Sequence, residues 1–159
     1  MDKRALTESV ISQLEAELAL QTEAALGSRE EATNEESRAE DKYDMRSQSA
    51  AYLAAGQARL ATEIAGAIKA WRAMPLRAFT AADEIASGAL VTLEGPGRTA
   101  TYLLGPQSGG MEARDGAESA TVVTGASPLG RQLLGRRLGD MVKIADRTGP
   151  VVHRVVAVA

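Results

Sequence analysis

The sequence predicts an α+β protein in which an N-terminal helical hairpin precedes a small antiparallel β domain with one short helix. Residues 1–74 contain no proline and only three glycines, whereas residues 75–159 contain five prolines and twelve glycines. Apolar residues repeat at helical spacing in the first half, and short β-branched runs bounded by turn residues fill the second. We therefore expect a hairpin domain over residues 1–74, a linker that starts at Pro75, and a β domain over residues 80–159.

Two apolar stripes predict the helices of the hairpin. The first stripe consists of Leu6, Val10, Leu14, Leu18 and Ala25. The second follows the 4-3-4-3-4 spacing of a coiled-coil seam and consists of Leu53, Gln57, Leu60, Ile64, Ala67 and Trp71. A polar segment separates them, which favours two antiparallel helices. One continuous helix in an intermolecular coiled coil is the alternative, because no proline or strong glycine signal marks a reversal.

Three aromatic residues of the first half have structural interpretations. Tyr43 and Tyr52 are expected to pack between helices, and Trp71 is expected to anchor the hairpin to the β domain. Aromatic residues make up only 3% of the chain and alanine supplies much of the apolar content, a composition that suits slender helices approaching closely.

In the second half, five β-branched segments predict strands, at residues 88–93, 99–104, 120–124, 141–144 and 151–158. A short helix is expected over residues 127–135, where Ser127 is a natural N-cap, Pro128 fits the first helical position and Gly135 is a stop signal. Residues 80–85 are expected to form a turn of helix that enters the domain.

Composition excludes several classes of protein. Cysteine is absent, so disulfides, thiolate metal sites and cysteine nucleophiles are excluded, and a single histidine, His153, makes a zinc site or a Ser-His-Asp triad untenable. No apolar run approaches the ~20 residues that a membrane helix needs. No secretory signal is recognised at the N-terminus, so we expect a cytoplasmic protein with no membrane partner.

Negative charge is concentrated in one short stretch. The chain carries a net charge of −3, yet residues 28–46 alone contain seven acidic and four basic side chains. A solvated loop is the simplest interpretation of such a run, and the weak overall charge disfavours non-specific nucleic-acid binding.

Residues 127–144 resemble the C-terminal signature of the Gre family of bacterial transcription elongation factors. A Ser-Pro pair opens a short helix, a Leu-x-Gly pattern ends it, and a Gly-Asp turn and a strand follow. Residues 88–93 are similar to the first strand of that family, and residues 40–44 and 49–57 resemble the tip and descending helix of a Gre-like subgroup. The resemblance spans essentially the whole chain.

The resemblance implies a coiled-coil finger followed by an FKBP-like domain. In this family the domain docks at the rim of the secondary channel of RNA polymerase, and acidic residues of the finger tip help to hold a second Mg²⁺ and a water at the polymerase active site. Backtracked RNA is then cleaved by the polymerase itself. This chain would accordingly be an accessory factor rather than an enzyme, a monomer whose partners are RNA polymerase and, indirectly, the 3′ end of the nascent RNA.

Carried over by position, the resemblance assigns Glu40 and Asp41 as the tip acids that share Mg²⁺ with the polymerase, with Glu36 and Asp44 as substitutes. The tip departs from the family pattern, because Asp41 stands where the family has asparagine, Glu36 replaces an aspartate, and Tyr43 follows Glu40 by three positions rather than four. The polymerase-binding surface is assigned to Ser127, Pro128, Leu129, Arg136 and Arg137. The two arginines also fit a solvated turn, and Ser127 also fits a plain helix cap.

Three other functions remain open from the sequence. A Gre-like regulator could occupy the channel without supporting cleavage, as the departures at the tip would allow. A prolyl isomerase is disfavoured because the β domain offers only Phe79 and Tyr102 as aromatic lining. A structural coiled-coil dimer through residues 1–74 is the third.

Overall fold

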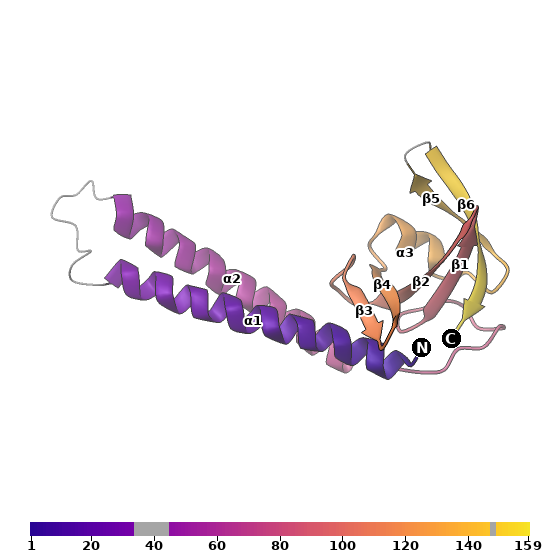
Figure 1. Ribbon diagram of the computed structural model, residues 1–159, viewed down its shortest axis with the longest axis horizontal. Coiled ribbons are helices and arrows are strands. Elements are labelled where there is room, and N and C mark those ends of the chain that lie inside the picture. The colour runs from indigo at the N-terminus through magenta and orange to yellow at the C-terminus, as the bar shows by residue number, and fades with distance from the viewer. Residues whose placement is uncertain (34–44, 147–148) are drawn as a thin grey trace. The chain divides into compact units, whose positions relative to one another are not determined.

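The computed structural model describes residues 1–33, 45–146 and 149–159, and it confirms the predicted α+β class (Figure 1). Two long helices come first and are followed by strands and one short helix. The elements in chain order are α1 (Lys3–Thr33), α2 (Met45–Ala73), β1 (Leu90–Gly95), β2 (Arg98–Gly105), β3 (Glu112–Asp115), β4 (Glu118–Thr124), α3 (Pro128–Leu133), β5 (Met141–Asp146) and β6 (Gly149–Val158). Within the described residues, neither long helix is apolar enough to cross a membrane.

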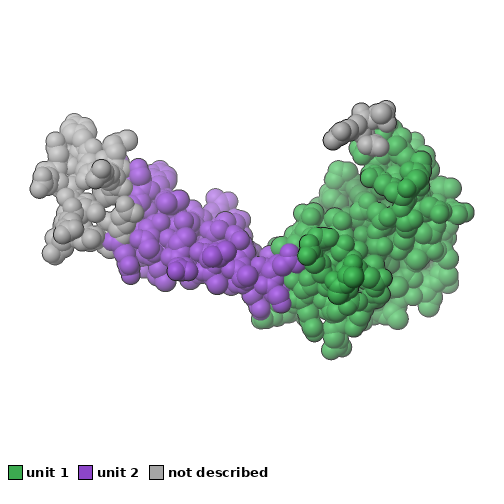
Figure 2. Space-filling view, viewed as in Figure 1, with its two compact units in different colours: residues 1–11, 69–159 green, residues 12–68 purple. Residues whose placement is uncertain are grey.

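The chain forms two compact units that divide both long helices (Figure 2). One unit contains residues 12–68, the larger part of α1 and α2. The other contains residues 1–11 and 69–159, and so combines the sheet with the first residues of α1 and the last residues of α2. α2 ends two residues before Pro75, the residue at which we predicted its termination.

Within residues 12–68, α1 and α2 pair along a seam whose composition changes along its length. Leu14 and Ile64 are buried large apolar residues. Nearer the acidic stretch the seam contains small and polar side chains, and the hydroxyl of Ser28 donates to Oε1 of Gln57 at 3.0 Å. This hydrogen bond joins residues 29 positions apart, as an antiparallel hairpin requires.

The seam of α2 differs from the predicted one near the acidic stretch. Leu53 and Leu60 are 56% and 40% exposed, whereas Ala54 and Ala61 are half-buried in their place. A shift of one residue rotates a helix face by about 100°. Tyr52 is 85% exposed, so its predicted packing role is wrong. Small residues of both helices, among them Ala25, Ala54 and Ala61, line an apolar hollow in this part of the seam.

The described strands form one six-stranded sheet in the order β3-β4-β2-β1-β6-β5. Four of the five pairings are antiparallel, but β2 and β4 run parallel, which corrects the prediction of a purely antiparallel sheet. The parallel pair arises because β3 lies between β2 and β4 in the sequence yet pairs only with β4. β3 was not predicted, since its four residues are charged except for Ala113.

The core of the β domain covers one face of the sheet. Its buried members come from β1, β2, β5, β6, α3 and the segment that precedes β1, and they are Phe79, Ile85, Ala89, Val91, Leu93, Leu104, Leu133, Val142 and Val155. Tyr102 packs against this cluster. Both aromatic side chains that could have lined a prolyl isomerase site are thus part of the packing.

The last turns of α2 pack on the sheet through Trp71. Its side chain is only 1% exposed, and a Cβ at Gly105 of β2 would lie 2.4 Å from its ring. Only glycine therefore permits this contact. Leu6 and Val10 of α1 are fully buried in the same unit, and the Arg114 amide donates to the Ser9 hydroxyl at 3.2 Å.

Substituting Gly105→Ala is expected to lower the free energy of unfolding by about 1–3 kcal/mol, because the added methyl overlaps the Trp71 ring. Gly66→Ala in α2 is a matched control, since nothing lies within 4 Å of its Cβ position. That change should stabilise the protein by about 0.5–1 kcal/mol. Urea unfolding followed by circular dichroism measures both, and equal effects of the two changes would contradict the proposed contact.

Candidate functional site

The predicted tip acids lie outside the described residues. α1 ends at Thr33 and α2 begins at Met45, so Glu36, Glu40, Asp41 and Asp44 all belong to the connection between the helices. Tyr43 belongs to it as well. In the part of the chain that the structure describes, no group of three or more histidine or carboxylate side chains could hold a metal ion. The Mg²⁺ assignment to Glu40 and Asp41 therefore stays a prediction.

The predicted polymerase-binding residues surround α3. Ser127 is the N-cap of this helix, where its Oγ accepts from the Gly130 amide at 3.0 Å and donates to the Thr124 carbonyl at 2.8 Å. Pro128 is exposed in the first turn, whereas Leu129 packs against the core cluster. Gly130 is required here, because a Cβ would lie 1.9 Å from the Thr124 carbonyl oxygen.

The turn that follows α3 is fixed by backbone hydrogen bonds to the segment before β1. The Ile85 amide donates to the Arg136 carbonyl at 2.7 Å, and the Gly135 amide donates to the Ile85 carbonyl at 2.9 Å. This two-way pairing holds Arg136 and Arg137 at the surface in a set orientation. It also diverts Ile85 from helical hydrogen bonding, which explains why the expected turn of helix at residues 80–85 is an ordinary turn instead.

The two arginines differ in what they contact. Arg137 donates to the Ala82 carbonyl at 3.2 Å and pairs with Glu84 at 2.9 Å. Arg136 is exposed, and its Nε donates to the Gln132 carbonyl of α3 at 3.3 Å. Since no acidic partner of Arg136 is found in the described residues, its charge is the more available of the two to an acidic surface.

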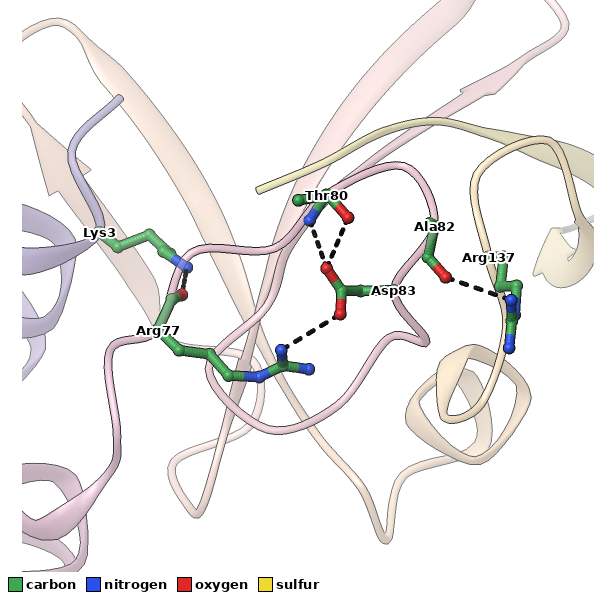
Figure 3. Close-up of polar contacts among 6 residues, drawn as sticks. All are labelled: Lys3, Arg77, Thr80, Ala82, Asp83 and Arg137. Carbon is green, nitrogen blue, oxygen red and sulfur yellow. Dashed lines mark hydrogen bonds and ion pairs between the residues drawn. The ribbon is translucent and has the colours of Figure 1, made fainter.

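A polar network that was not predicted from the sequence stabilises the segment before β1, around Asp83 (Figure 3). The Asp83 carboxylate accepts from the amide and hydroxyl of Thr80, at 2.8 and 2.7 Å, and from Arg77 at 3.4 Å. The Thr80 hydroxyl, then the Thr80 amide and Arg77, hold the pKa of Asp83 below its ordinary value. The Thr-x-x-Asp spacing at residues 80–83 was the signal in the sequence.

α1 joins this network through Lys3, whose ammonium donates to the Arg77 carbonyl. Lys3 and Arg77 both lie over the ring of Phe79, with 4.9 and 3.8 Å to its centroid. Burial, and secondarily the charge of Arg77, lower the pKa of Lys3. The segment that leads into β1 is thus held by α1, by its own turn and by the turn after α3.

His153, the single histidine of the sequence, is buried in β6. Its Nδ1 lies 3.1 Å from the Val151 carbonyl, and its ring fills the space beside Gly95, where a Cβ would lie 2.2 Å from it. A ring enclosed in this way between two strands serves packing.

Comparison with known proteins gives one similar sequence and a group of similar structures. The chain is 37% identical over 71 residues to the transcription elongation factor GreA of Thermomicrobium roseum, a match that covers 45% of this chain and 42% of that protein. The chain therefore spans less than half the length of the curated relative it matches. This similarity confirms the predicted resemblance to the Gre family. No protein-family model matches the chain.

The similar structures include two crystal structures of Gfh1, a GreA factor homologue. Gfh1 of Thermus thermophilus is 23% identical, with a TM-score of 0.40 over 98% of this chain and 95% of that one. Gfh1 of Thermus aquaticus is 26% identical, with a TM-score of 0.40 over 98% and 94% of the two chains.

Ser127→Ala is expected to destabilise the protein by about 1 kcal/mol, because it removes the N-cap acceptor of α3. Ser127→Thr keeps both the acceptor for the Gly130 amide and the hydroxyl donor to the Thr124 carbonyl, so it should recover most of that loss. Thermal unfolding of the three proteins measures the difference. An alanine variant as stable as the parent would show that the cap contributes nothing.

Asp83→Asn is expected to destabilise the protein at neutral pH and to matter progressively less in acid. A carboxyl whose folded pKa is depressed stabilises the fold above its unfolded value of about 3.9, and this contribution is lost as the pH falls through the folded pKa. The free energies of unfolding of the parent and of Asp83→Asn, measured between neutral and acidic pH, give their difference as a function of pH. A constant difference at every pH would contradict this origin, and Thr80→Val should raise the Asp83 pKa part of the way back.

Proposed function

We propose that this chain is a Gre-type accessory factor that binds RNA polymerase at its secondary channel and stimulates the polymerase's own cleavage of backtracked RNA. The observation that carries the proposal is a pair of helices of 31 and 29 residues joined by a strongly acidic segment. Residues 34–44 contain five acidic and two basic side chains. The similarity to GreA supports this assignment, and the whole activity is proposed on that basis.

The hairpin suits entry into a narrow channel. At 1.5 Å per residue, the 31 residues of α1 extend over about 45 Å. Ala54 and Ala61 stand at the seam in place of the predicted Leu53 and Leu60, and they add little side-chain volume to the helix pair. Both helices lead directly into residues 34–44, so the acidic side chains are attached to the ends of two paired helices.

In the proposed complex, Glu40 and Asp41 supply carboxylate oxygens to a Mg²⁺ that the polymerase also holds. Magnesium prefers such oxygen ligands and keeps several waters, so one or two carboxylates from the factor are sufficient. A bound Mg²⁺ polarises a phosphate and lowers the pKa of a coordinated water. The chain itself would contribute position and charge, with Glu36 and Asp44 adding to the negative field around the tip.

The surface around α3 is the proposed attachment to the rim of the channel. Ser127, Pro128 and Leu129 form the start of the helix, and Arg136 and Arg137 follow its end. Hydrogen bonds hold both ends of this surface, from the Ser127 hydroxyl to the Thr124 carbonyl and from the Gly135 amide to the Ile85 carbonyl, so it would bind with little loss of conformational freedom. Arg136 is the residue best placed to meet an acidic surface.

The test is a cleavage assay on backtracked elongation complexes that carry end-labelled RNA. The parent protein is expected to shorten the RNA in a Mg²⁺-dependent reaction, and Glu40→Ala with Asp41→Ala should lower the rate at least about tenfold while polymerase binding is unchanged. Glu23→Ala with Glu63→Ala is the matched control, because it removes the same charge from exposed positions on the helices.

Two outcomes would overturn parts of the proposal. Inhibition of transcription without new RNA 3′ ends would replace stimulated cleavage by occupation of the channel. Failure of the parent protein to bind the polymerase would reject the assignment as a whole. If the parent does bind, Arg136→Glu should weaken that binding.

A further inference from the structure

β5 is an edge strand whose outer backbone groups can be identified. It pairs with β6 on one side only. In an antiparallel ladder, alternate residues direct their N–H and C=O groups toward the partner and away from it. Val155 donates to the Asp140 carbonyl at 2.9 Å, and Ala145 faces Pro150, which has no N–H to give. Both facts show that the backbone N–H and C=O groups of residues 140, 142 and 144 point toward β6. The backbone groups of Met141, Lys143 and Ala145 therefore point toward the outer edge.

One side chain of α3 occupies the middle of that edge. The Lys143 amide donates to Oε1 of Gln132 at 2.8 Å, and Nε2 of Gln132 donates to the Lys143 carbonyl at 2.8 Å. The amide group of Gln132 thus makes the same two hydrogen bonds that the backbone of an added strand would make. No such contact covers Met141 or Ala145 in the described part of the chain.

The opposite edge of the sheet is protected by a similar device. β3 has only four residues, and the Arg114 amide donates to the Ser9 hydroxyl of α1 at 3.2 Å. Unpaired strand edges invite pairing with another chain, and natural sheets block them with short strands, lysines and covering elements. β5 is longer, at six residues, so it offers more outward backbone groups and its protection depends more on Gln132.

We propose that Gln132 is an edge lock that keeps β5 from pairing with β5 of a second copy of this chain. The outward backbone groups of β5 can pair only with another extended strand. β5 of a second copy is such a strand, with the same outward groups. Met141 and Val152 are 56% and 50% exposed on β5 and β6, which gives the paired edge apolar surface to bury. Lys143 is a weaker second guard, because antiparallel pairing brings the two lysines near each other.

Sedimentation of a Gln132→Met variant over a concentration series up to about 1 mM tests the proposal. Methionine keeps the length of the side chain but removes both hydrogen bonds. The parent should remain monomeric and the variant should form dimers whose fraction rises with concentration. Arg131→Met is the matched control, since it places the same side chain at a neighbouring exposed position of α3 and should stay monomeric.

A second substitution in β5 and a hydrogen-exchange measurement test whether the dimer forms through the β5 edge. Ala145→Pro removes an outward N–H without removing a bond to β6, so Gln132→Met with Ala145→Pro should again be monomeric. Amide hydrogen exchange at Lys143 should be about tenfold faster in monomeric Gln132→Met than in the parent. A folded variant that loses this protection yet stays monomeric at every concentration would overturn the proposal, as would dimers that persist with proline at position 145.

Discussion

Within the unit of residues 1–11 and 69–159, the central packing contact is that of the Trp71 ring with the backbone of Gly105. Trp71 is near the end of α2 and Gly105 is the last residue of β2, so this contact packs the last turns of α2 on the sheet. Burial of a tryptophan is worth about 3–5 kcal/mol, as judged by truncation to alanine. Its Nε1 finds no hydrogen-bond partner among the described residues, at a cost of about 1–3 kcal/mol. The apolar gain is the larger, which is why the contact persists with an unpaired donor.

In the turn after α3, backbone hydrogen bonds fix the position of the chain, and the charges of Arg136 and Arg137 contribute little to it. The Arg137–Glu84 pair is more than half exposed on both sides, and such surface pairs contribute at most about 1 kcal/mol. The paired hydrogen bonds between Ile85 and residues 135 and 136 are the stronger constraint, because they fix two chain segments in register. The predicted binding surface is therefore rigid for reasons unrelated to its charges, and the Arg136 charge could change without loss of the fold.

The sequence predicted those features that depend on local spacing. Helical periodicity, the absence of proline before Pro75 and the Ser127–Pro128 pair located α1, α2 and α3 to within a few residues. It also predicted that Trp71 packs on the β domain, but it did not predict other features that depend on distant partners. The seam of α2 contains Ala54 rather than the predicted Leu53, because the contacts with α1 decide which face of α2 is covered. β3 was missed because its stability comes from pairing with β4. Gln132 carries no signal in the sequence, since only the fold brings Lys143 beside it. The tip acids were named by resemblance and lie outside the described residues.

The same logic explains the composition of the hairpin. A helix pair stabilised mainly by leucines would be thicker, and one without a seam would be marginal, because isolated helices gain little from propensity alone. Here the large buried residues, Leu14 and Ile64, occur early in α1 and late in α2, whereas Ser28 and Gln57 pair nearer the acidic connection. Alanine has the highest helix propensity and the smallest side chain after glycine, so it maintains both helices while adding little width. In the described residues, alanine therefore supplies helix stability where the seam has no large apolar side chain to bury.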